Sequence, residues 1–275
     1  MRNIYLVKFG GNALDGKGGM RQLAHEVADL VRDGYSIVLV HGGGPEISAE
    51  MERLGMKPMK VAGVRITDEA GLEVAEKVLK KINADLVDCL LDAGAIAVGM
   101  PGYFCTECER KKPYKAVENG KELTVDPGLV GEVVSVDKQT IFDLLDQHIV
   151  PVVYPIGAEV VGDKMQHLNV NADTMAAGIA AGVECKEMIA ITDVPGILEN
   201  VHDLSSKIDR VTFKEIDQLL ADGTISGGMV PKVEACRKAV LAGAEAVRMV
   251  NGRDPESIVK DVIMGAPKGT LIVKE

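Results

Sequence analysis

Short apolar runs alternate with longer amphipathic segments along most of this chain. β-Branched runs bounded by turns predict strands over residues 4-9, 36-41, 95-99, 149-154, 187-192 and 245-250. Between these runs, apolar residues recur every three or four positions, most clearly over 68-93, which predicts a long amphipathic helix. Strands that alternate with helices are typical of a parallel sheet covered on both faces. The predicted fold class is therefore α/β.

Residues 100-135 break this alternation, because they are rich in Gly, Pro, Lys and Glu. The turns Glu118-Asn119-Gly120 and Asp126-Pro127-Gly128 predict hairpins that stand outside the main sheet. We interpret this region as a β-hairpin flap over a binding site.

Composition narrows the class of protein. The chain has 275 residues, 47% of them hydrophobic, which excludes a disordered chain and allows one large domain or two lobes. A net charge of -10 argues against a nucleic-acid or anionic-membrane partner. We find no signal peptide and no apolar stretch of the ~20 residues that a membrane span requires. The five cysteines are odd in number and mostly scattered, which suits a reducing compartment. We expect a soluble cytoplasmic protein.

Glycine-rich turns directly follow the first two predicted strands. They are Gly10-Gly11-Asn12 and His41-Gly42-Gly43-Gly44-Pro45. Such turns expose backbone amides where a strand ends and a helix begins, and these amides bind phosphate. Neither turn is a G-x-x-x-x-G-K-[ST] P-loop, and neither has G-x-G-x-x-G spacing. In open parallel sheets ligands lie beyond the carboxyl ends of the strands, so both turns are expected at one site.

Further motifs belong to the same edge of the predicted sheet. The first, Asn169-Val170-Asn171-Ala172-Asp173, precedes a helix of small residues. The second, Thr192-Asp193-Val194-Pro195-Gly196, follows the strand 187-192. The third, Gly227-Gly228-Met229-Val230-Pro231-Lys232, opens a helix with proline in its first turn. The free amides of such a helix start favour an anion.

Together these motifs resemble the amino-acid kinase family, and within it most closely the N-acetylglutamate kinases. The resemblance runs nearly end to end and also includes Gly63-Val64-Arg65-Ile66-Thr67-Asp68 and Gly269-Thr270-Leu271-Ile272. It implies one domain over 1-275 with an open three-layer αβα sandwich. An acceptor lobe over about 1-165 would bind the acid, and a lobe over about 166-275 would bind Mg-ATP. The implied reaction converts the side-chain carboxylate of N-acetylglutamate to an acyl phosphate in arginine biosynthesis.

The chemistry of this reaction requires charge more than proton transfer. A carboxylate with a pKa near ~4 is already ionised at neutral pH, so the reaction needs no general base. Catalysis then consists of positioning and of neutralising the negative charge that develops during transfer. By resemblance, Lys8 and Lys232 contact the phosphoryl group from opposite lobes. Asp173 is expected to hold both lysines by charge-assisted hydrogen bonds.

The resemblance also assigns binding residues. The planar fork of Arg65 suits the acceptor's α-carboxylate, and Asn169 adds a second polar contact. Gly43 and Gly44 are expected to bind the acceptor side with their amides. The residues expected to contact ATP are Gly10, Gly11, Thr192, Asp193, Gly196, Gly228 and Met229. Mg²⁺ is the expected second cofactor, and no protein ligand is assigned to it.

Each of these residues also has a structural interpretation. Lys8 fits a solvated residue at the end of a strand, Asp173 fits an N-cap of its own helix, and Arg65 fits a surface ion pair. We interpret His41 as a structural hydrogen-bonding residue, because the reaction needs neither an acid nor a base.

The pair Cys105-Thr106-Glu107-Cys108 is half of a zinc-site pattern, but the other cysteines lack the spacing of a second half. We interpret it as a bare dithiol on the flap. Nearby, Met100-Pro101-Gly102-Tyr103-Phe104 stands where N-acetylglutamate kinases have a Ser-Gly-Lys-Asp-Gly-like turn.

Two alternative functions stay open at this point. The basic stretch Glu109-Arg110-Lys111-Lys112 resembles the flap of kinases that phosphorylate aminoadipate or glutamate on a small acidic carrier protein, whose docking it would favour. A non-catalytic, amino-acid-sensing paralogue is the second. Family members pair as homodimers through the region of the 68-93 helix, and arginine-inhibited hexamers carry an extra N-terminal helix. Because Lys8 lies so close to Met1, we expect a dimer without arginine feedback.

Overall fold

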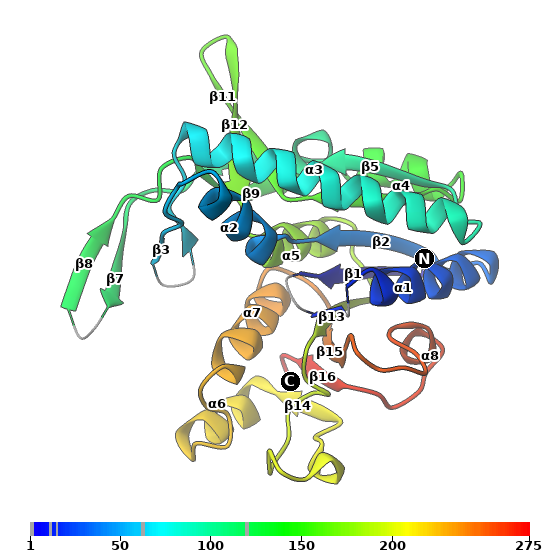
Figure 1. The fold of residues 1–275 in the computed structure, drawn as a ribbon. Coiled ribbons are helices and arrows are strands. Elements are labelled where there is room, and N and C mark those ends of the chain that lie inside the picture. Colours follow the sequence, from blue (N-terminus) through cyan, green and yellow to red (C-terminus); the bar gives the residue numbers. More distant parts are fainter. Residues whose placement is uncertain (1–2, 11–12, 15, 62–63, 119–120) are drawn as a thin grey trace.

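An eight-stranded sheet forms the centre of the molecule (Figure 1). The structure is a computed structural model and describes residues 3–10, 13–14, 16–61, 64–118 and 121–275. The strand order is β14-β16-β15-β13-β1-β2-β10-β5, and only β15 and β16 pair antiparallel. These strands are β1 (Ile4–Phe9), β2 (Ser36–His41), β5 (Ala97–Pro101), β10 (Val150–Tyr154), β13 (Glu187–Thr192), β14 (Arg210–Thr212), β15 (Val247–Asn251) and β16 (Thr270–Val273). The mainly parallel sheet is confirmed.

Helices cover both faces of this sheet. Strand β1 shows why, because Leu6 packs into one buried cluster while Val7 packs into the other. The Leu6 side is covered by α4 (Lys138–Leu145), α5 (Ala172–Gly182), α6 (Phe213–Ala221) and α7 (Met229–Leu241). The Val7 side is covered by α1 (Gly16–Arg32), α3 (Glu69–Asp92) and α8 (Lys260–Ile263). The three-layer αβα sandwich is confirmed.

The predicted strands of the central sheet lie where the apolar runs placed them. The runs 4-9, 36-41 and 187-192 coincide with β1, β2 and β13, and the other three differ from their strands by one or two residues at one or both ends. The predicted helix 68-93 is α3, which begins after Asp68, whose carboxylate accepts a 2.7 Å hydrogen bond from the Gly71 amide.

A second sheet lies against the α5 side of the molecule and was not predicted. Its order is β11-β12-β9-β6, with β6 (Thr106–Arg110), β9 (Val130–Val136), β11 (Ile156–Val161) and β12 (Lys164–Val170). The small residues of α5 allow this contact: a Cβ on Gly178 would lie 2.7 Å from Val133, and one on Gly182 would lie 2.5 Å from Val136. Glycine here lets β9 approach the helix closely.

One of the two hairpins expected in the flap region forms, but the turn at 126-128 and the position of Cys105 and Cys108 differ from the expectation. The strands β7 (Tyr114–Glu118) and β8 (Lys121–Val125) do form a separate hairpin, which extends away from the body in Figure 1, with its predicted turn partly outside the described residues. The turn at 126-128 instead leads into β9 of the second sheet. Cys105 and Cys108 are not on the hairpin but are buried, free thiols whose pKa burial raises, to about 12 for Cys105.

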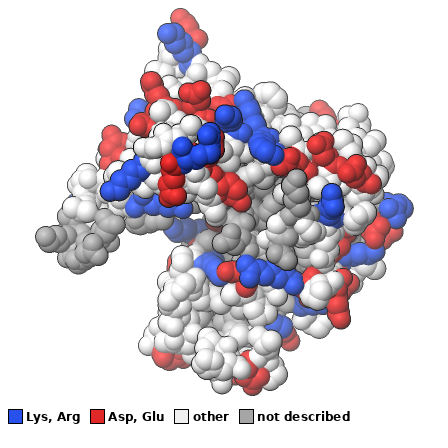
Figure 2. Space-filling view, viewed as in Figure 1, with Lys and Arg blue, Asp and Glu red and all other residues white. Residues whose placement is uncertain are grey.

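The remaining elements are short. Helix α2 (Gly44–Arg53) follows the second glycine turn, β3 (Lys60–Val61) and β4 (Val64–Arg65) form a small hairpin, and η2 (Gly102–Phe104) and η3 (Leu204–Ser206) are 3₁₀ turns. Basic and acidic side chains are interspersed over the α3 region on the face seen in Figure 2. Within the described part of the chain, none of the helices is both long and apolar enough to cross a membrane.

Candidate active site

A cavity of about 240 Å³ lies at the carboxyl ends of β1 and β2. The glycine turns, the β3–β4 hairpin and the start of α5 form its walls, so motifs distant in sequence meet there as predicted. The predicted residues that line it are Lys8, Gly10, Gly43, Gly44, Arg65, Asn169 and Asp173. The predicted residue Gly11 lies outside the described residues.

The glycine turns are packed tightly enough to explain their composition. A Cβ added to Gly10 would lie 3.4 Å from the Cα of Gly42, so the two turns touch backbone to backbone. A Cβ on Gly43 would lie 2.7 Å from the side chain of Ile82 on α3. A side chain at Gly43 would therefore push aside the ends of the Ile82 and Leu79 side chains.

Arg65 is a buried residue that braces the second glycine turn. Only 7% of it is exposed, and one guanidinium nitrogen donates to the Gly44 carbonyl at 2.9 Å and to the Ser48 hydroxyl at 2.8 Å. Burial lowers the pKa of Arg65. It is not the surface ion pair that its structural interpretation proposed. Asn169 faces the same cavity and donates to the Thr67 hydroxyl at 3.1 Å.

Lys8 and Asp173 form an ion pair at the floor of the cavity. The Lys8 ammonium lies 2.7 Å from a carboxylate oxygen of Asp173, and the Lys8 side chain is only 14% exposed. Asn171 is the N-cap of α5, because its side chain accepts from the amides of Asp173 and Thr174. Asp173 is therefore in the first helical turn rather than at the N-cap.

A second cavity of about 220 Å³ adjoins the first, and Lys8 and Asp173 line both. Lys232 enters it from α7, opposite Lys8 on β1. Asp173 was expected to hold both lysines. It pairs with Lys8, but Lys232 pairs with Asp193 instead. The hydrogen bond from Lys232 lowers the pKa of Asp193. Each lysine thus has its own carboxylate.

The predicted nucleotide turn after β13 is held by its neighbours. The hydroxyl of Thr192, which lines the second cavity, lies 3.0 Å from the Val194 carbonyl oxygen and 3.2 Å from the Val250 carbonyl oxygen, and its one proton can donate to either. Gly196 has a φ of +138°, and a Cβ there would lie 2.5 Å from the Thr270 hydroxyl. That hydroxyl accepts from the Ile197 amide at 2.9 Å. The closing glycine-threonine motif therefore supports the turn.

Some predicted nucleotide residues lie beside the cavities rather than in their walls. Gly228 precedes α7 and Met229 begins it, and a Cβ on Gly228 would meet no described atom within 4 Å. Neither of them lines the two cavities, nor do Asp193 and Gly196. Lys8 and Lys232 therefore line one cavity, whereas the predicted nucleotide residues Asp193, Gly196, Gly228 and Met229 lie outside both cavities.

Two further residues complete the geometry. His41 is fully buried, bonds the Gly42 carbonyl and the Asn83 amide through its two ring nitrogens, and has its pKa lowered to about 4 by burial. It has the structural role that was predicted. Lys60 lines the first cavity and was missed; burial and nearby Arg65 lower its pKa.

Comparison with known proteins agrees with this geometry. The model of the amino acid kinase family matches residues 3–251. An acetylglutamate kinase of Methanococcus maripaludis is 37% identical over 98% of this chain and 92% of its own, and one of Archaeoglobus fulgidus is 38% identical over 97% and 92%. The solved carbamate kinase from Giardia lamblia bound to AMP-PNP is similar in fold, with a TM-score of 0.69 at 16% identity over 100% of this chain and 99% of its own. This chain belongs to the amino acid kinase family.

Proposed function

We propose that this protein phosphorylates the side-chain carboxylate of N-acetyl-L-glutamate with ATP, giving an acyl phosphate in arginine biosynthesis. The acetylglutamate kinases of M. maripaludis and A. fulgidus, similar over nearly the whole chain, support this proposal. So does the fold shared with a kinase bound to an ATP analogue. A lobe over about 1–165 would bind the acid, and a lobe over about 166–275 the nucleotide.

The observation that carries the proposal is the position of Lys8 between the two cavities. One cavity has Arg65 and Asn169 in its wall, and the other has Thr192 and Lys232. An acceptor carboxylate in the first cavity and a γ-phosphate in the second would meet at Lys8. Both lysines would then face the transferring group, as an in-flight phosphoryl group requires.

No side chain has to move a proton in this reaction. The acceptor carboxylate is ionised at neutral pH, so its oxygen attacks the γ-phosphorus directly and ADP leaves. His41 is an unsuitable base, because it is buried with both ring nitrogens engaged. Asp173 would keep the Lys8 ammonium aimed at the phosphoryl oxygens, and Asp193 would do the same for Lys232.

The acceptor is proposed to be an acidic amino-acid derivative because the first cavity is rich in donors. Arg65, Lys60 and the amides of Gly43 and Gly44 can bind the α-carboxylate, and Asn169 can bind the amide of the acetyl group. Substrates carried on an acidic protein are not favoured, since the relatives at 37–38% identity are named acetylglutamate kinases.

Mg²⁺ is the proposed second cofactor. In kinases this ion is bound largely by substrate phosphates and by one or two carboxylates. Asp173 lines both cavities and its side chain is 38% exposed, so it is the carboxylate that we propose to approach a phosphate-bound ion. When bound, Mg²⁺ would neutralise phosphate charge.

We also propose a cytoplasmic homodimer. Strand β5 is an edge of the main sheet, and several apolar side chains in it and near it in sequence are exposed: Leu91, Ile96, Val98 and Phe104. Exposed apolar side chains at a sheet edge favour an interface. A location with ATP and a reducing environment fits the substrate and the five free cysteines. A monomer in sedimentation velocity would contradict the dimer.

The function is tested by a hydroxamate assay, which traps acyl phosphates. We expect hydroxamate from N-acetylglutamate that depends on ATP and Mg²⁺. Lys8→Ala is the matched control, because it removes the proposed contact and leaves the rest of both cavities. A parent protein that binds ADP yet forms no hydroxamate would instead support a sensing paralogue.

A further inference from the structure

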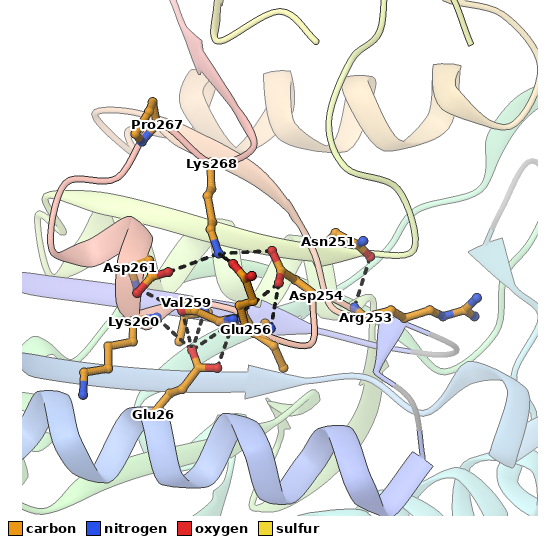
Figure 3. A network of polar contacts seen from close by, with 12 residues as sticks. Glu26, Asn251, Arg253, Asp254, Glu256, Val259, Lys260, Asp261, Pro267 and Lys268 are labelled. Carbon is orange, nitrogen blue, oxygen red and sulfur yellow. Dashed lines mark hydrogen bonds and ion pairs between the residues drawn. The ribbon is translucent and has the colours of Figure 1, made fainter. Parts of the chain in front are cut away.

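A polar network behind the nucleotide side joins α1 to the segment between β15 and β16 (Figure 3). Its first anchor is Glu26 on α1, which is only 8% exposed. The Glu26 carboxylate accepts hydrogen bonds from the amides of Ile258, Val259 and Lys260 at 2.7–3.0 Å and from the Ser257 hydroxyl at 3.2 Å. One side chain thus holds the backbone at the start of α8.

Its second anchor is Lys268, whose ammonium points down among carboxylates in Figure 3. It lies 3.1 Å from Asp261 and 3.2 Å from Asp254, with Glu256 at 3.9 Å. Asp254 also accepts from the Glu256 amide at 2.9 Å, so it fixes its own turn. Lys268 therefore ties the loop that leads into β16 to the turn that follows β15.

Both tied segments contact the nucleotide turn directly. The Gly252 amide, two residues before Asp254, donates to the Thr192 carbonyl at 2.8 Å. Thr270, two residues after Lys268, accepts from the Ile197 amide at 2.9 Å. Lys268 thus holds together the two segments whose contacts fix the turn 192–197, Gly252 at its start and Thr270 at its end.

The same segment also reaches the first glycine turn. A Cβ on Gly252 would lie 2.0 Å from the Ala13 carbonyl oxygen, and the Ala13 amide donates to the Gly10 carbonyl at 3.3 Å. Glycine at 252 lets the segment touch the end of that turn and the turn after β13 at once. Displacement of residues 251–254 would therefore move both turns.

We propose that Lys268 and Glu26 are positioning residues for the nucleotide: they hold residues 251–254 and 269–270 against the turn 192–197 and so preorganise it for ATP. This inference rests on the proposed function only in taking the turn 192–197 as the ATP side. Neither residue lines the two cavities, so each acts through the backbone that it holds. The tied segment acts on the turn 192–197 and on the turn at Gly10, both expected to contact ATP, so its main effect should be on nucleotide binding.

The test replaces the ammonium while keeping the length of its side chain, as Lys268→Met. We expect the KM for ATP to rise roughly tenfold, with kcat and the KM for N-acetylglutamate changed less than about twofold, because only nucleotide binding loses its preorganised turn. Lys268→Arg keeps the charge and the donors and should restore the KM for ATP to within about threefold. Glu26→Gln should act in the same direction as Lys268→Met.

Lys138→Met is the matched control, because Lys138 forms an exposed ion pair with Glu184 and lines neither cavity. It should leave every constant unchanged. If Lys268→Met does not fold, Asp261→Asn replaces it, since it removes one carboxylate from Lys268 at nearly constant shape. It should weaken ADP binding in calorimetry, and unchanged ADP binding would overturn the inference.

Calorimetry with ADP alone separates this inference from the proposed function. If the parent binds ADP but does not phosphorylate N-acetylglutamate, the function fails, while weaker ADP binding by Lys268→Met still supports the inference. Equal rises in both KM values, an unchanged affinity for ADP, or an arginine variant no better than methionine would overturn it.

Discussion

The two sides of the candidate active site are built differently. On the acceptor side, Gly43 packs against α3 and buried Arg65 braces the turn that ends at Gly44. On the nucleotide side, Gly228 has no described atom near its Cβ position, and the Asp193 side chain is 45% exposed. Side-chain packing shapes the acceptor side, whereas the nucleotide side is an open turn that residues 251–254 and 269–270 hold in place.

This difference follows from what each side would bind. A small acid is recognised by the shape and charge of a closed pocket, which buried donors provide. A nucleotide phosphate is bound by backbone amides and lysines, which need exposed turns with little side-chain bulk. Acceptor selectivity should therefore depend on contacts inside the first cavity, and nucleotide affinity on the contacts that hold the turn 192–197 in place.

The largest effect is expected at the boundary between the two sides. Lys8→Ala and Lys232→Ala should each lower kcat by on the order of 10²-fold or more, because preorganised charge matters most while the phosphoryl group is in transit. The KM values should change much less. Steady-state kinetics with both substrates measures this, and a variant that keeps most of its kcat would remove that lysine from the mechanism.

Arg65→Lys tests whether the acceptor side is selective. An ammonium cannot reproduce the planar fork or keep both contacts, to Gly44 and Ser48. We expect the KM for N-acetylglutamate to rise roughly tenfold or more, while ADP affinity stays nearly constant. Equal damage to both ligands in calorimetry would mean that Arg65 supports the whole site.

A matched pair of glycine substitutions sharpens the comparison. Gly43→Ala places a Cβ 2.7 Å from the end of the Ile82 side chain and 3.1 Å from that of Leu79, so both ends must shift; we expect a loss of about 1 kcal/mol in the free energy of unfolding, because side-chain ends move more easily than backbone. Gly228→Ala enters open space at a φ of −69°, so stability should change by less than about 0.5 kcal/mol.

Thermal unfolding of the two variants measures this difference. If Gly228→Ala destabilises as much as Gly43→Ala, the nucleotide side is not open in the free protein. A loss of ADP affinity in a fully stable Gly228→Ala would place the backbone at 228 against the phosphates.

The sequence predicted the central sheet and the meeting of the motifs because these depend on local pattern. Runs such as Ile4–Phe9 are apolar except for Lys8 near the carboxyl end, as is typical of strands buried on both faces. Once the strands are parallel, turns at their carboxyl ends share one edge, so Lys8 and Asn169 were expected at one site.

The second sheet and the ion pairs could not be predicted this way. Val160 is 77% exposed at the end of β11, so apolar residues there do not mark an inward face. Lys232 pairs with Asp193, 39 residues away in the sequence, and the Glu26 carboxylate accepts from the Val259 amide, 233 residues away. Spacing along a single chain carries no signal for such pairs, and Lys60 looks like any other lysine before a turn.

The smallest effect is expected at the β7–β8 hairpin, which belongs to neither side of the comparison. None of its described residues lines the two cavities, and the basic residues before it have local partners: Arg110 donates to the Gly128 carbonyl at 2.8 Å, and Lys111 pairs with Glu132. The triple variant Arg110→Ser, Lys111→Ser, Lys112→Ser should keep kcat/KM for N-acetylglutamate within a few-fold.

The dependence of kcat/KM on salt concentration distinguishes a free acid from a carrier-linked acid as the acceptor. A free acid needs no long-range steering, so the parent's kcat/KM should vary little as the Debye length falls from ~10 Å at 0.1 M to ~3 Å at 1 M. An acidic carrier protein that docked on these charges would associate far more slowly at high salt. If the parent turned over only a carrier-linked acid, and the triple variant lost that turnover, the hairpin would be a third functional region. The acceptor assignment would then be wrong, while the positions of Lys8 and Lys232 in the second cavity would still fit phosphoryl transfer.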